Sequence, residues 1–78
     1  MPDRIDVIVV EQGTQRGIAG VAVTTGDGIA TTGADGTCAI EVDPLARFAW
    51  ISCPEGKRPV GDFYCPLPVS EVVFELAA

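Results

Sequence analysis

The chain has 78 residues, 47% of them hydrophobic, and a formal net charge of −6 from five basic and eleven acidic residues. A chain this short holds a single domain, residues 1–78, and buries too little surface for a large core around a deep cleft. It contains no histidine, which excludes a Ser-His-Asp triad, a Cys-His pair and zinc sites built on histidine. Its acidity disfavours nucleic acid as a partner, because phosphate binding needs clustered basic residues.

The composition favours short strands over helices. Nine glycines and six prolines are typical of strands joined by turns, and the hydrophobic fraction argues against disorder. No apolar run approaches the ~18 residues that span a membrane. The charged N-terminus from Met1 to Asp6 does not resemble a signal peptide. We therefore expect a cytosolic protein, or a mature or excised part of a longer one.

Apolar residues recur with a period of two, which predicts strands rather than helices. The segments with this pattern, together with one brief extended piece, are residues 5–10, 21–24, 29–32, 37–42, 48–53, 63–65 and 69–76. Short strands at this spacing predict an all-β fold, a small antiparallel β-sandwich of six to seven strands.

Turns and loops separate these segments. Residues 11–17 and Lys57–Asp62 are polar and predict loops, and Gly26-Asp27-Gly28 predicts a tight turn. Asp35-Gly36 lies between two β-rich runs, which predicts a hairpin turn with the glycine in the left-handed conformation. Pro44–Arg47 is the only helix-compatible stretch, one turn at most.

Alternation assigns the side chains of each strand to two faces. The residues expected to face the core are Cys38, Ile40, Val42, Ala49, Ile51 and Cys53, and those sharing one face of the last strand are Val72, Phe74 and Leu76. Phe48 and Trp50 then lie on the opposite face, away from the core.

Three cysteines, Cys38, Cys53 and Cys65, lie in apolar stretches. Their spacings fit no Cys-x-x-Cys zinc or redox motif. We interpret them as small buried side chains. One disulfide with a free thiol is the alternative, and a metal site is the least favoured interpretation.

Two parts of the first half carry a resemblance to a known family. The segment Gly17–Thr24 reads Gly-Ile-x-Gly-Val-x-Val, and the turn Thr31–Thr37 precedes an alternating strand. This order is similar to the carboxypeptidase-regulatory-like, transthyretin-like modules, which commonly end in a Val-Ser-x-Pro-Gly-Tyr piece, matched here by Ile51–Lys57. The resemblance implies a transthyretin-like or Ig-like Greek key.

A narrower resemblance lies in the second half. Phe48–Gly56, followed by Asp62-Phe63-Tyr64 and Leu67, resembles the N-terminal domain that precedes calcineurin-like metallophosphoesterase catalytic domains in bacteria. The match covers roughly Gly13 to Leu67, although Lys57 replaces a usual aromatic residue and Gly33 a usual aspartate. It implies a non-catalytic accessory domain whose partner is a catalytic domain in the same parent chain or in another protein, and it implies export or a cell-envelope location.

The catalytic centre of that family cannot lie in this chain. Calcineurin-like phosphoesterases hold two metal ions with Asp, His and Asn ligands, and the chain has neither His nor Asn. Asp27 and Asp35 lie in glycine turns, and no loop of alternating aspartates typical of a calcium site is present. We therefore expect no enzymatic activity, catalytic residue, metal or cofactor within these residues.

The aromatic residues supply a candidate interface. Phe48 and Trp50, extended by Phe63 and Tyr64, would form an exposed apolar patch, and such patches usually mark interaction sites. The alternative is that the C-terminal strand or the 57–66 segment folds over the rings. The sequence thus leaves two functions open, an accessory docking domain and a free-standing module that binds protein or carbohydrate.

Overall fold

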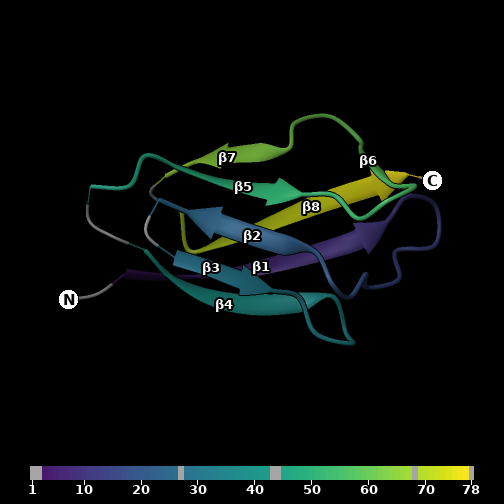
Figure 1. Cartoon of the computed structure of the whole chain (residues 1–78), viewed down its shortest axis with the longest axis horizontal. Coiled ribbons are helices and arrows are strands. Elements are labelled where there is room, and N and C mark those ends of the chain that lie inside the picture. The colour runs from purple at the N-terminus through teal and green to yellow at the C-terminus, as the bar shows by residue number, and fades with distance from the viewer. Residues whose placement is uncertain (1–2, 27, 43–44, 68, 78) are drawn as a thin grey trace.

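The computed structural model describes residues 3–26, 28–42, 45–67 and 69–77. This part of the chain forms two four-stranded sheets with no helix (Figure 1). The strands are β1 (Asp3–Glu11), β2 (Ala22–Thr25), β3 (Gly28–Thr31), β4 (Thr37–Val42), β5 (Phe48–Ser52), β6 (Arg58–Pro59), β7 (Tyr64–Pro66) and β8 (Glu71–Ala77). Sheet A has the order β4-β1-β8-β6 and sheet B the order β3-β2-β5-β7. The predicted small all-β sandwich is confirmed.

One pairing departs from a purely antiparallel arrangement. β1 is antiparallel to β4 on one side but parallel to β8 on the other, with Val7 opposite Val72 and Val9 opposite Phe74. A parallel pair needs a long connection between its strands. The six strands that separate β1 from β8 in the sequence provide it.

The core lies between the two sheets. In β4, β5 and β8, alternate side chains turn inward, as expected from the period of two. The cluster of buried side chains comprises Ile5, Val7, Val9, Val21, Val23, Ile40, Val42, Ala49, Ile51, Phe74 and Leu76, and Cys38, Cys53, Cys65 and Val72 pack against it half-buried. The predicted inward faces of β4, β5 and β8 are therefore confirmed.

The turn at Asp35-Gly36 does not form a hairpin, so that prediction is wrong. Gly36 has the expected left-handed φ of 79°, but β3 and β4 belong to different sheets, so the turn leads from sheet B to sheet A. Asp35 Oδ1 accepts hydrogen bonds from Thr37 N at 3.1 Å and Thr37 Oγ1 at 2.8 Å. These contacts shape the turn locally whichever strand β4 then pairs with.

The β2–β3 connection is the hairpin. β2 and β3 pair from Ala22 opposite Thr31 to Thr25 opposite Gly28, and Gly26 has a φ of 69° that favours glycine. Asp27 lies outside the described residues. A tight turn was predicted here, and the strands on its two sides, β2 and β3, pair with each other.

Two other segments differ from expectation or fall outside the described residues. The segment Lys57–Asp62 is not entirely loop, because Arg58 and Pro59 form β6 and pair with the end of β8. This strand raises the number in the described chain to eight rather than six or seven. Residues 45–47 form no helix, and Pro44 lies outside the described residues. In the described part of the chain, no helix is long and apolar enough to cross a membrane.

Candidate functional site

The four predicted interface residues come together on the outer face of sheet B. Phe48 and Trp50 lie on β5, Tyr64 lies on β7 directly opposite Trp50, and Phe63 immediately precedes Tyr64. Together they line a shallow hollow of about 430 Å³. Phe48, Phe63 and Tyr64 are 47%, 51% and 40% exposed, and Trp50 is half-buried.

The rings meet edge to face rather than lying in one plane. The Phe48 and Tyr64 ring centres are 5.8 Å apart with an angle of 76° between the planes, and those of Phe63 and Tyr64 are 5.5 Å apart at 71°. This is a favoured geometry for aromatic pairs. Because neighbouring rings stand nearly upright to one another, they do not form one coplanar platform around the shallow hollow.

Sheet B carries no charge along its strands. None of β2, β3, β5 and β7 contains an acidic or basic residue, whereas every strand of sheet A contains at least one. Strand register places Ile29, Thr24, Trp50 and Tyr64 in one row across the outer face of sheet B. The aromatic hollow therefore occupies one end of an uncharged sheet face.

Two polar groups at the hollow make no hydrogen bond to the described residues. The Trp50 indole N–H and the Tyr64 hydroxyl take part in no such contact. Both groups are donors. The surface of the hollow itself is almost wholly apolar, so it offers a bound molecule chiefly hydrophobic contact.

The C-terminal strand does not cover these rings, because β8 lies in sheet A beside β1. The 57–66 segment covers them in part, since its Tyr64 ring packs edge to face against Phe48 and Trp50 is half-buried. Sequence reasoning missed Thr24 and Ile29 as members of the same face. The short β2–β3 hairpin, whose register pairs these two residues, is the signal that would have found them.

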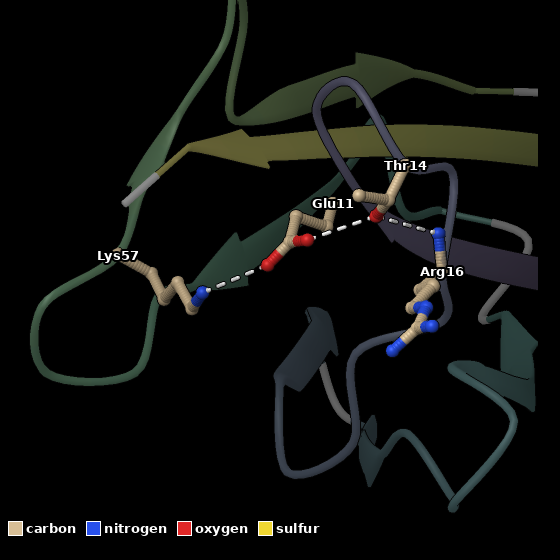
Figure 2. Close-up of polar contacts among 4 residues, drawn as sticks. All are labelled: Glu11, Thr14, Arg16 and Lys57. Carbon is tan, nitrogen blue, oxygen red and sulfur yellow. Dashed lines mark hydrogen bonds and ion pairs between the residues drawn. The ribbon is translucent and has the colours of Figure 1, made fainter.

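A polar cluster lies elsewhere, at the end of β1 (Figure 2). Glu11 accepts a hydrogen bond from Thr14 Oγ1 at 2.8 Å and forms an ion pair with Lys57 Nζ at 3.4 Å. The backbone N–H of Arg16 donates to Thr14 Oγ1 at 3.3 Å. The Thr14 hydrogen bond, and then Lys57, lower the pKa of Glu11 below its usual value. These contacts join the 11–17 loop to the β5–β6 connection, which is a structural role.

Metal-ligating side chains do not gather among the described residues. No group of three or more Cys, Asp or Glu side chains in that part of the chain is placed to hold an ion. Cys38, Cys53 and Cys65 are all free thiols, so the single-disulfide alternative is wrong.

Comparison with known proteins gives no family for this chain. No protein-family model, no curated protein and no solved structure matches it significantly.

Proposed function

We propose that this chain is a non-catalytic accessory β-sandwich that docks onto another protein through the aromatic hollow of sheet B. The observation that carries the proposal is the hollow itself, lined by Phe48, Trp50, Phe63 and Tyr64 on an uncharged sheet face. Aromatic side chains are enriched among the anchors of protein interfaces. Phe48, Phe63 and Tyr64 are 40–51% exposed, so they leave apolar surface in water that a bound partner would cover.

The resemblance supplies the partner. The Phe48–Gly56 motif and the Phe63-Tyr64 pair resemble the domain ahead of calcineurin-like metallophosphoesterase catalytic domains. Two of the residues in each of these motifs line the hollow. We therefore propose a catalytic domain of that class, in the same parent chain or in another protein, as the partner.

The ring geometry favours a protein over carbohydrate. A sugar ring stacks best on an aromatic face that lies flat and open, but the interplanar angles of 76° and 71° turn ring edges toward their neighbours. Ring edges around a shallow apolar hollow suit the apolar side chains of a protein, and aromatic residues are common anchors of protein interfaces. We assign no chemical step to this chain, since its sequence contains no histidine that could act as a base.

Calorimetric titration tests the proposal. The chain is titrated with the purified catalytic domain of a calcineurin-like metallophosphoesterase encoded in the same gene or operon. We expect binding that weakens about tenfold or more in Trp50→Ala or in Phe48→Ala. Val73→Ala is the matched control, because Val73 is 56% exposed on the other sheet, and it should bind as the natural chain does.

Three results would contradict the proposal. The first is a failure of the natural chain to bind the catalytic domain, and the second is equal binding by the Trp50→Ala, Phe48→Ala and natural chains. The third is glycan-array binding that disappears in Trp50→Ala, which would favour the carbohydrate-binding alternative. Circular dichroism of each variant establishes that the sandwich has formed.

A further inference from the structure

The outer face of sheet B carries an exposed aliphatic side chain as well as the hollow. Ile29 on β3 is 72% exposed. It lies in the same cross-strand row as Trp50 and Tyr64, which line the hollow, with Thr24 between them. Ile29 and the hollow are therefore level with each other along the strands, and about 10–15 Å apart across the sheet at a strand spacing of about 4.8 Å.

This arrangement makes the face complementary to itself. When two copies of sheet B pack face to face about a two-fold axis that runs along the strands, β3 of one copy lies over β7 of the other. The axis introduces no shift along the strands, so Ile29 of each copy meets the hollow of the other copy. An isologous interface makes each such contact twice. Packed sheets lie about 10 Å apart, a gap that interdigitating side chains fill.

The distribution of charge favours this contact between two copies over others. Each copy carries a net charge of −6, so two copies repel each other at long range. Every strand of sheet A contains at least one charged residue, whereas no strand of sheet B does. The charged residues that precede rings of the hollow in the chain, Arg47 and Asp62, are opposite in sign. Contact through sheet B therefore brings no strand charges of like sign together.

We propose that the free chain forms a two-fold symmetric dimer through sheet B, with Ile29 of each copy seated in the aromatic hollow of the other. The surface of the hollow is almost wholly apolar, so an aliphatic side chain suits it. The dimer uses the surface that we propose for docking, so a second copy and the catalytic domain exclude each other. This last consequence rests on the proposed docking function, whereas the dimer itself does not.

The size of the face predicts a weak dimer. Sheet B has four short strands, the longest of five residues, so its face is on the order of 15 Å on a side. Such a face buries less than the roughly 800 Å² per copy of a standard specific interface. We therefore expect a reversible equilibrium between monomer and dimer, with a Kd of about 10 μM to 1 mM.

Sedimentation equilibrium of the natural chain, over about 10 μM to 1 mM, measures this association. We expect the dimer fraction to rise with protein concentration and with salt, which screens the repulsion between the copies. Ile29→Asp should weaken dimerisation about tenfold or more, because it places a charge against the apolar hollow and each dimer carries it twice. Val73→Asp is the matched control. It adds the same charge at a side chain that is 56% exposed on sheet A, and it should weaken dimerisation about twofold or less.

Two complementary variants test the contact itself. Ile29→Lys puts a cation on one side of the contact and Phe48→Glu puts a carboxylate in the hollow, so each variant alone should dimerise about tenfold or more weakly than the natural chain. An equal mixture of the two should associate about tenfold or more tightly than either variant alone. In the mixed dimer one contact pairs lysine with glutamate, and the other keeps Ile29 in an unaltered hollow. Circular dichroism of each variant establishes that the sandwich has formed.

Any of three outcomes overturns the dimer. The natural chain can stay monomeric throughout the concentration range. Ile29→Asp and Val73→Asp can weaken dimerisation equally, which would place the interface elsewhere, such as at a free sheet edge. The mixed variants can associate no better than each does alone.

These measurements contain the chain alone, so they separate the dimer from the docking proposal. If the chain dimerises through Ile29 but the catalytic domain neither binds nor dissolves the dimer, docking is wrong and the dimer stands. If the catalytic domain binds through Trp50 and the chain alone is monomeric, the dimer is wrong and docking stands. If both occur, the catalytic domain should convert the dimer into a complex with one copy of the chain.

Discussion

Thr32 joins two segments through one buried hydroxyl. It follows β3, is 4% exposed, donates from Oγ1 to the Ile18 carbonyl at 2.7 Å and accepts from Val21 N at 3.0 Å. The strand end and the segment that leads into β2 are thereby held together. No apolar side chain of the same shape can make these contacts.

We expect Thr32→Val to lower the free energy of unfolding by about 1–3 kcal/mol, because the buried Val21 N–H and the part-buried Ile18 carbonyl lose a partner while the side-chain volume is kept. Urea denaturation measures the change. Thr31→Val is the control, since Thr31 is exposed on β3, and it should stay within about 0.5 kcal/mol of the natural chain. Equal effects of the two substitutions would show that the Thr32 hydroxyl has no special role.

Glu11 connects two elements that are distant in the sequence. It ends β1 and contacts Lys57 in the connection between β5 and β6, as Figure 2 shows. Its pKa is lowered, first by the Thr14 hydrogen bond and then by Lys57. A carboxylate whose pKa is lower in the folded state than in the unfolded chain stabilises the fold above the unfolded pKa and loses that contribution as the pH falls.

We therefore expect part of the stability to be lost as the pH falls below the usual glutamate pKa of 4.5. In Glu11→Gln this part of the pH dependence should be missing, so its urea midpoint falls less between neutral and acidic pH. Glu55→Gln is the matched control, because it removes the same charge from an exposed turn. If the pH profiles of Glu11→Gln and the natural chain coincide, the contact between these elements contributes nothing to stability.

The molecule as a whole divides its surface between two unlike sheets. The strands of sheet A carry the charged residues and those of sheet B carry none, although both sheets share one core. The charged sheet keeps the protein hydrated, and the uncharged sheet presents the aromatic hollow. A domain with this division has one face suited to a partner and one suited to solvent.

The domain is held together without covalent links between its strands. Its three cysteines are free and half-buried, and burial raises the pKa of the Cys38 thiol. We expect a reductant to leave the urea midpoint unchanged, and we expect iodoacetamide to label Cys38 more slowly in the native protein than in urea, because a thiol with a raised pKa forms little thiolate. A midpoint that drops with reductant, or equally fast labelling in both states, would contradict this.

Much of the fold could be predicted from the sequence because each strand shows a local alternation of apolar and polar residues. Alternation in β4, β5 and β8 identified the inward side chains, and the same alternation put Phe48 and Trp50 on the outer face. No local pattern indicates which strands pair with one another in each sheet. Asp35-Gly36 has the chemistry of a hairpin turn, yet it leads into the other sheet, because a turn specifies a change of direction and not the partner of the next strand.

The aromatic hollow, too, is determined partly by the sequence and partly by the tertiary structure. The sequence by itself determined that Phe48 and Trp50 share the outward face of their strand and that the chain has no histidine, since these follow from residue identity and a period of two. Only the tertiary structure decided that β7 pairs with β5, which brings Phe63 and Tyr64 beside Phe48 and Trp50, and that β8 joins sheet A instead of covering them. Such pairings depend on contacts between residues far apart in the chain, and the common core selects among them.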